Sequence, residues 1–350
     1  MDRYIAFDAH DESCTAVVVG PSGKQLTAQV LETNGAAVVQ FLRTVPGCRH
    51  VALEEGALSQ WLYELIEPHV DDVVVAVADK SSGQKNDLED AKRLAESLRL
   101  GAIKQPVYKI PRSLAELRCA IRGYRFLSQD VVRSKQRLKS VFRSRGIVSE
   151  AELYSPKRRG PLLRRLPAAE RGLASRLAEE LDALSVILKN QQKHLEQVAD
   201  TNADVKLLMT APGIGLIRAS TIVAIIGTPN RFRTSRQLWN YCGLGVVFRT
   251  SSDWVREGGR WMRVPQRQSR GLNRNRNPWL KSVFKSAATG LIAKQPDHPL
   301  SRDYQRAVES GSEPNLAKLT LARRLAAIVL AMWKHKEEYD PGKHTPKTAG

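Results

Sequence analysis

The sequence has little cysteine, no long apolar run and fewer acidic than basic side chains. Its four cysteines lie far apart and form no Cys-x-x-Cys pair, which argues against a disulfide framework or a zinc knuckle and favours reduced, cytosolic thiols. No apolar run approaches the roughly 20 residues needed to span a bilayer. The N-terminus carries Asp2 and enters a strand pattern at once, so we do not expect a signal peptide.

The shortage of acidic residues leaves the chain strongly positive. Fifty-five lysines and arginines stand against 36 aspartates and glutamates, which gives a net charge of +19 and a pI of about 10.0. A surface this basic predicts a polyanionic partner, and nucleic acid is the commonest one. A ribosome-associated or heparin-like binder would have the same charge, so composition alone assigns no chemistry.

The first hundred residues alternate between strand and helix patterns. We predict strands at 4–8, 15–20, 24–30, 50–53 and 72–78, and helices at 36–44 and 87–100. Strands that first form a meander and are then separated by helices indicate a mixed α/β sheet. The first domain is predicted to cover residues 1–108.

Helical periodicity begins at Arg112 and predicts two long helices, at 112–147 and 168–203, separated by a break at 156–161. In the second helix apolar residues recur in alternating steps of three and four, which is typical of a coiled coil. The seam consists of Ala174, Leu177, Leu181, Leu184, Leu188, Gln191, Leu195 and Val198. The pattern suits an intramolecular hairpin and a contact with another subunit equally well, and this coiled-coil region is assigned to 109–204.

The remaining residues, 205–350, are predicted to be loops and mostly helices. A Pro-Gly-Ile-Gly turn between two apolar helices resembles a helix–hairpin–helix, in which Gly213 and Gly215 would let backbone N–H groups approach a phosphate. An ordinary αα-turn that contains Pro and Gly would look the same. An arginine-rich loop follows, and guanidinium groups match phosphate oxygens. Its arginines are Arg256, Arg260, Arg263, Arg267, Arg270, Arg274 and Arg276.

Four acidic residues stand where predicted elements begin or end. Asp8 ends the first strand pattern and Glu54 ends the fourth, while Asp87 and Asp90 lie three residues apart at the start of a helix and so on one side of it. Carboxylates that meet in this way supply the oxygen ligands that Mg²⁺ prefers, and two ions about 4 Å apart share several of them. Each acid taken singly also suits a cap or a solvated surface.

These residues resemble a known family. Asp8 in YIAFDAH, Glu54 in VALEEG and the pair in KNDLEDA resemble the DEDD motif of insertion-sequence transposases related to the pilin-gene invertase. Those proteins have a RuvC-like, RNase H-like α/β domain at the N-terminus and are guided by a bridge RNA. The resemblance implies that Asp8, Glu54, Asp87 and Asp90 bind Mg²⁺, with two ions per site. Many members have Thr-Gly soon after the glutamate where this chain has Glu55-Gly56-Ala57, so Glu55 stays an alternative to Glu54.

A pair of serines, Ser251 and Ser252, lies just before the arginine-rich run. By chemistry alone these are ordinary loop residues. The order APGIG, RF, a GL step, Ser-Ser and NPWLKSVFKSAA resembles the C-terminal transposase domain of the same family, which places a nucleophilic serine there. The resemblance implies that Ser252 is the nucleophile. Ser251 is the alternative, because Asp253 stands where the family has glycine.

Together these features predict a DNA recombinase of an insertion sequence. The resemblance implies Mg²⁺-dependent cleavage and exchange of double-stranded donor and target DNA through a 5′-phosphoserine intermediate, guided by a bridge RNA. We expect a homodimer or tetramer, in the bacterial cytoplasm and associated with the nucleoid. Two other hypotheses stay open: a RuvC-like Holliday-junction endonuclease that uses carboxylates and water only, and a non-catalytic nucleic-acid-binding protein.

Overall fold

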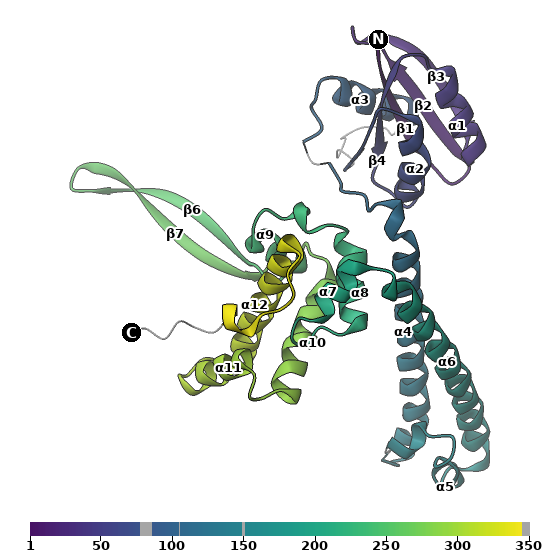
Figure 1. Cartoon of the computed structure of the whole chain (residues 1–350), viewed down its shortest axis with the longest axis vertical. Helices are drawn as coiled ribbons and strands as arrows, with labels where there is room; N and C mark the ends of the chain where they lie inside the picture. The colour runs from purple at the N-terminus through teal and green to yellow at the C-terminus, as the bar shows by residue number, and fades with distance from the viewer. Residues whose placement is uncertain (78–85, 105, 149–150, 345–350) are drawn as a thin grey trace. The chain divides into compact units, whose positions relative to one another are not determined.

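The computed structural model describes residues 1–77, 86–104, 106–148 and 151–344, and it divides into two compact units, Met1–Ser113 and Leu114–Gly350 (Figure 1). The predicted boundaries at 108 and 204 stay a prediction. None of the helices in the described ranges is long and apolar enough to cross a bilayer.

The first unit contains a mixed five-stranded sheet, as predicted. Strands β1 (Asp2–Ala9), β2 (Ser13–Val19) and β3 (Gln25–Glu32) form an antiparallel meander. Strands β4 (Cys48–Glu54) and β5 (Asp72–Ala76) continue the sheet on the other side of β1, both parallel to it. The resulting strand order, β3-β2-β1-β4-β5, is compatible with an RNase H-like domain.

Helices cover both faces of this sheet. On one face α1 (Gly35–Thr44) and α2 (Ser59–Ile66, extended by a 3₁₀ turn at Glu67–His69) pack on large side chains that include Phe7. On the other face α3 (Asp87–Arg99) packs on a separate cluster of small side chains. That cluster consists of Ala6, Val17, Val19, Ala91 and Ala95. Because side chains alternate along a strand, residues next to Phe7 in β1 point toward α3.

The second unit is helical apart from one hairpin. Its α-helices are α4 (Ala115–Arg143), α5 (Gly160–Arg164), α6 (Ala168–Asp200), α7 (Ala203–Met209), α8 (Leu216–Ile226), α9 (Ser235–Cys242), α10 (Pro278–Lys294), α11 (Pro299–Glu309) and α12 (Pro314–His335). Short 3₁₀ turns lie at Arg112–Leu114, Ala151–Tyr154, Pro229–Arg231 and Pro341–His344. The core of the C-terminal helices is centred on Phe284 of α10 and Trp333 of α12, both fully buried.

The two long helices α4 and α6 pack against each other within the chain (Figure 1). Ala174 and Leu181 of the predicted seam are buried against Leu138 and Phe142 of α4. Farther along the seam, the Gln191 side-chain amide donates a hydrogen bond of 2.9 Å to the Ala120 carbonyl. The intramolecular alternative therefore accounts for the seam, while coiled-coil geometry is not confirmed and a contact with another subunit stays a prediction.

Strands β6 (Val246–Glu257) and β7 (Arg260–Leu272) form an antiparallel hairpin where loops were predicted, so that prediction was wrong. The two turn residues, Gly258 and Gly259, have φ values of +57° and +80°, and the hairpin turn requires this left-handed conformation. The strand pattern was missed because this segment has no apolar face, and alternation is the usual signal of a half-buried strand. Proline at position 265 is compatible with β7 because both strands of a two-stranded ribbon are edge strands, where the missing N–H donor of proline is tolerated.

The helical pair offers a test of the intramolecular packing. Replacing the fully buried Leu138 with alanine leaves a cavity between α4 and α6, so Leu138→Ala should lower the free energy of unfolding by about 2–5 kcal/mol. Val132→Ala on the same helix, where the valine is 55% exposed, is the control and should change stability by less than about 0.5 kcal/mol. Urea unfolding followed by circular dichroism measures both, and equal losses would contradict this packing.

Candidate functional site

The ends of two parallel strands bring the first two acids to the same edge of the sheet. Phe7 of β1 pairs in register with Leu53 of β4, so Asp8 and Glu54 are the next residues along each strand. Phe7 and Leu53 both point into the core on the α1–α2 face, and by alternation the two acids point to the α3 face. The Asp8 side chain is 14% exposed.

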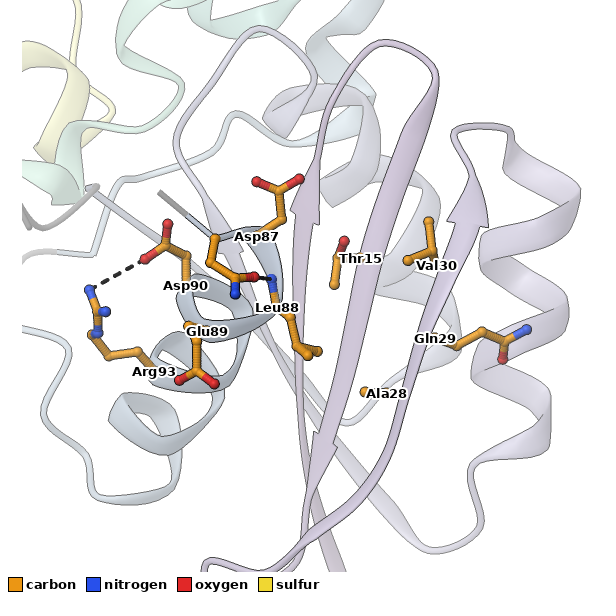
Figure 2. A pocket seen from close by; sticks show the side chains of 10 residues that line it. Thr15, Ala28, Gln29, Val30, Asp87, Leu88, Glu89, Asp90 and Arg93 are labelled. Atoms are coloured by element: carbon orange, nitrogen blue, oxygen red, sulfur yellow. Dashed lines mark hydrogen bonds and ion pairs between the residues drawn. The ribbon is translucent and has the colours of Figure 1, made fainter. Parts of the chain in front are cut away.

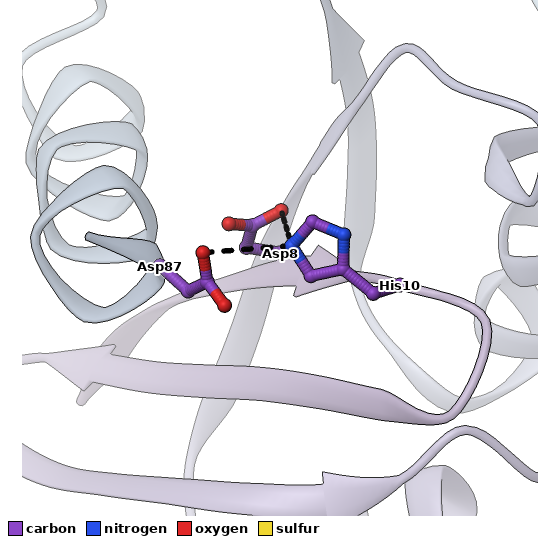
Figure 3. Close-up of side chains that lie close together, drawn as sticks. All are labelled: Asp8, His10 and Asp87. Atoms are coloured by element: carbon purple, nitrogen blue, oxygen red, sulfur yellow. Dashed lines mark ion pairs between the residues drawn. The ribbon is translucent and has the colours of Figure 1, made fainter. Parts of the chain in front are cut away.

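The start of α3 brings a third acid to this edge. Asn86 caps the helix, and its side-chain oxygen accepts a hydrogen bond of 3.1 Å from the Leu88 N–H, so Asp87 is the first helical residue. The chain reaches this position close to the sheet because α3 presents the small side chains of Ala91 and Ala95 to Ala6, Val17 and Val19 of the sheet. Asp87 thus faces the end of β1 across a short gap (Figure 3).

A histidine that the sequence analysis missed lies between these acids. The His10 Nε2 atom is 3.8 Å from an Asp8 carboxylate oxygen and 3.5 Å from an Asp87 carboxylate oxygen (Figure 3). One donor atom from each of the three residues lies within 4.8 Å of the others. The signal was present as Asp-Ala-His, in which the histidine follows the strand-end acid by two residues and therefore shares its side of the chain.

The Asp8–His10–Asp87 group has the donors that a divalent cation needs. Two carboxylates of like charge held this close are stabilised by a cation between them, and oxygen ligands suit Mg²⁺ or Mn²⁺. The histidine nitrogen adds a donor that manganese accepts readily. The nearby Cys14 is not a thiolate ligand, because burial and then the charge of Asp8 raise the pKa of its thiol to about 12.

The other two predicted ligands stand beside this group. Asp90 lies one turn along α3 from Asp87, where its carboxylate is 3.3 Å from the Arg93 guanidinium (Figure 2). Glu54 is next to Asp8 in register. Among the described residues, only Asp8, His10 and Asp87 form a group of close metal donors, so ligand roles for Glu54 and Asp90 stay a prediction.

Glu55, the alternative to Glu54, has a structural partner. Its carboxylate accepts hydrogen bonds from the Lys109 ammonium and, at 3.2 Å, from the Ser59 hydroxyl. Lys109 also donates to the Ser59 hydroxyl at 2.7 Å, and only 6% of its side chain is exposed. A nearly buried ammonium needs a carboxylate partner. Glu55 therefore has a structural role that involves no metal.

An open hollow of about 890 Å³ lies directly beside the acids (Figure 2). Its floor is formed by Thr15, Ala28 and Val30 of strands β2 and β3, and its wall by the N-terminal part of α3 between its cap, Asn86, and Arg93. Val30 is 67% exposed, because no helix covers this part of the sheet. Of the metal-ligand candidates, Asp87 and Asp90 line this hollow and can be reached through it by a large substrate.

The predicted nucleophile lies on the hairpin of the second unit. Ser252 pairs in register with Pro265, and Ser251 with Gln266. The side chains of both serines, and those of Arg263, Arg267 and Arg270, lie outside the described residues. A meeting of Ser252 with the acids therefore stays a prediction. The other four predicted arginines have exposed side chains: Arg256, Arg260, Arg274 and Arg276.

Cations also gather at the start of α10, immediately after the hairpin. Burial, and then the positive charges of Arg276 and Lys285, lower the pKa of Lys281 below its usual value. The helix start is capped by Asn277, whose side-chain oxygen accepts hydrogen bonds from the N–H groups of Trp279 and Leu280. Mutually repelling cations at a helix N-terminus favour an anion such as a phosphate.

The Pro-Gly-Ile-Gly turn connects α7 to α8, and packing explains its first glycine. Gly213 has φ of +72°, and a Cβ atom there would lie 2.8 Å from the Ala287 carbonyl oxygen of α10. Its own carbonyl accepts a 2.7 Å hydrogen bond from the Arg218 guanidinium. Gly215, the N-cap of α8, is exposed. Gly213 is partly buried and Gly215 is exposed, so a phosphate contact is more accessible at Gly215.

Family models match both halves of the chain. Residues 5–145 match the DEDD transposase model of IS110-type elements, and residues 205–305 match the Transposase IS116/IS110/IS902 family. The chain belongs to the DEDD-type insertion-sequence transposases. The first match includes Asp8, Glu54, Asp87 and Asp90, and the second includes Ser252.

Individual relatives agree with this family. A probable family 20 transposase of Pseudomonas aeruginosa is 25% identical over 88% of this chain and 90% of its own length. An uncharacterized 44.8 kDa protein of insertion element IS116 from Streptomyces clavuligerus is 29% identical over 53% of this chain. The transposase of IS1111A from Coxiella burnetii is 25% identical over 49% of it. The chain spans 43% and 46% of the length of the last two relatives.

The Glu54 and Glu55 environments predict different effects of removing each charge. Glu55→Gln leaves the nearly buried Lys109 without its carboxylate, so the free energy of unfolding should fall by about 1–3 kcal/mol in EDTA. Glu54→Gln is the matched control because it keeps that ion pair, and its loss should be smaller. Urea unfolding measures the free energy of unfolding of both variants. An equal or greater loss of stability in Glu54→Gln would contradict a structural role specific to Glu55.

Proposed function

We propose that this protein is a DNA transposase that cuts and rejoins strands of an insertion sequence with divalent cations. The observation that carries the proposal is the convergence of Asp8 and Asp87 around His10 at an open edge of the sheet. These acids come from segments almost 80 residues apart in a chain of net charge +19. Membership of the DEDD family supports the use of a divalent metal at this place.

Asp8, Glu54, Asp87 and Asp90 are the proposed ligands, and Mg²⁺, with two ions, is the proposed metal. Asp8 and Asp87 fit this role by their distance to a common donor group, and Glu54 by its register beside Asp8. Asp90 would exchange its contact with Arg93 for the metal. Ions bound here would polarise a phosphodiester and stabilise the charge that develops during its cleavage.

Ser252 is the proposed nucleophile. Its Oγ atom attacks the phosphorus of a DNA phosphodiester, and the Oγ–P bond forms as the P–O3′ bond breaks. The leaving oxygen takes up a proton and becomes a free 3′-hydroxyl, while the 5′ end stays linked as a phosphoserine. In the second step the 3′-hydroxyl of another duplex attacks this phosphorus, the Oγ–P bond breaks, and the serine regains its proton.

The serine has no histidine or lysine on its own hairpin to act as a base. Residues 246–272 include neither histidine nor lysine, and a serine hydroxyl is a weak nucleophile without activation. The acids of the first unit are the proposed acceptors of the serine proton, which requires Ser252 and the acidic edge to meet during the reaction. That meeting can occur within one chain or between two subunits.

Double-stranded donor and target DNA are the proposed substrates. The exposed arginines Arg256, Arg260 and Arg274, the cations around Lys281, and Gly215 are the proposed phosphate contacts. A bridge RNA as guide rests on the family resemblance. Synapsis of two duplexes calls for a homodimer or tetramer, because each duplex needs its own set of reacting groups.

Metal binding can be tested without DNA. Mg²⁺ or Mn²⁺ that binds only the folded protein stabilises it by about 1.4 kcal/mol at ten times its dissociation constant, so the melting temperature should rise by a few degrees. Asp87→Asn and Asp8→Asn should abolish this rise. Glu89→Gln, in the same first turn of α3, is the control and should keep it. A rise that survives both aspartate substitutions would place the ion elsewhere.

The covalent step can be tested on a denaturing gel. Purified protein incubated with guide RNA, labelled DNA and Mg²⁺ should yield a protein band that carries label, and Ser252→Ala should abolish it while Ser251→Ala retains it. Cleavage that persists in Ser252→Ala without a labelled protein band would support the Holliday-junction endonuclease. An Asp87→Ala protein whose activities and metal response equal those of the wild type would support a non-catalytic binding protein.

A further inference from the structure

Two tryptophans lie on one face of the hairpin tip. In the β6–β7 register Trp254 pairs with Arg263 and Arg256 pairs with Trp261. Side chains two residues apart on a strand, and those directly opposite on its partner, share a face of the ribbon. Trp254, Arg256 and Trp261 therefore lie on the same face, which we call the tryptophan face.

The tryptophan face is open to solvent. Trp254 is 62% exposed and Trp261 is 64% exposed. The hairpin is a two-stranded sheet of its own, and no other strand in the described part of the chain flanks it (Figure 1). An indole can bury about 150–250 Å² of surface. Two such side chains that are exposed side by side in the free protein mark a surface that a partner covers.

The charge of the hairpin selects the class of partner. Residues 246–272 contain six arginines and two acidic residues, and the described side chains of Arg256 and Arg260 are exposed. Arginines that alternate with exposed aromatic rings suit a strand that has phosphates and free bases at the same time. In a duplex the flat faces of the bases are covered by their neighbours, so an indole can stack only on an unpaired base.

We propose that the tryptophan face binds unpaired nucleotides, in single-stranded DNA or RNA, by stacking bases on Trp254 and Trp261. Arg256 and Arg260 hold the neighbouring phosphates. The inference rests on the proposed function in that it takes nucleic acid as the partner of this hairpin. It adds that the hairpin recognises the unpaired state of a strand.

The position of the tryptophan face links it to the reaction. Ser252 precedes Trp254 by two residues in β6, a separation of about 6.6 Å along the strand. Stacked nucleotides rise about 3.4 Å each, so the separation corresponds to about two nucleotides. A base stacked on Trp254 then lies beside the phosphate that Ser252 attacks, and strand exchange needs bases that have left their duplex at this point.

The test measures binding in EDTA, where no strand is cut. Labelled 20-nucleotide single strands of DNA and of RNA, and the matching DNA duplex, are titrated with wild-type protein and followed by fluorescence anisotropy. Trp254→Ala and Trp261→Ala should each weaken single-strand binding about 5- to 100-fold and leave duplex binding unchanged. Trp254→Phe, which keeps an aromatic ring, should lose less than Trp254→Ala.

Three controls separate stacking from charge and folding. Trp61→Ala, which removes a partly exposed tryptophan of α2, should leave all affinities unchanged. Arg256→Gln should weaken single-strand and duplex binding alike and reduce the slope of log K against log salt by roughly 0.7–0.9. A strand of abasic sites keeps the phosphates and lacks the bases, so wild type and Trp254→Ala should bind it equally. Melting temperatures confirm that each variant is folded.

The outcomes distinguish this inference from the proposed function. Wild-type protein that binds no nucleic acid overturns both. If wild-type protein forms the serine adduct and Trp254→Ala and Trp261→Ala bind single strands as wild type does, the stacking inference alone is overturned. Tryptophan substitutions that alter only self-association or binding to anionic vesicles also overturn it, because the face then has a protein or lipid partner. A larger loss on RNA than on DNA identifies RNA as the source of the stacked bases, and the reverse identifies DNA.

Discussion

The close packing of α3 on the sheet is the constraint on which the acidic edge depends. Ala6 of β1 meets Ala91 and Ala95 of α3, and side chains of this size let the helix lie near the strands. The helix start is thereby held over the end of β1, where Asp87 and Asp8 share His10. Larger side chains in this layer would lift the first turn and separate the carboxylates. An exposed polar site is therefore positioned by a small, fully apolar contact one turn away.

The acids at this edge have different tasks although they look alike in the sequence. Glu55 neutralises the nearly buried Lys109 and so connects the segment after α3 to the start of α2. Glu54, its neighbour, points to the opposite side of the strand, toward the α3 face and beside Asp8 in register. Asp90 holds Arg93 in the absence of a metal. Alternation along the strand and the position of one lysine thus separate a structural carboxylate from a candidate ligand.

The second unit combines a packed helical core with a two-stranded hairpin. Trp333 and Phe284 anchor the helices, and Gly213 is held against α10 by backbone contact. The hairpin, by contrast, carries its tryptophans in solvent. Its strands are joined by their own antiparallel ladder and by a two-glycine turn. Such a ribbon gains stability when a partner covers it, which suits an element that meets its substrate only during the reaction.

The sequence by itself determined the mixed sheet, the two long helices and the positions of the acids in them, because strand alternation, helical periodicity and caps such as Asn86 are local properties. Family membership also followed from motifs in the chain. Tertiary structure alone decided that His10 joins Asp8 and Asp87, that Lys109 binds Glu55, and that the α6 seam is buried against α4. It also formed the hairpin from a segment without an apolar face. These outcomes depend on contacts between residues that are distant in the chain. The hydrophobic periodicity of each segment does not show which distant residue it will contact.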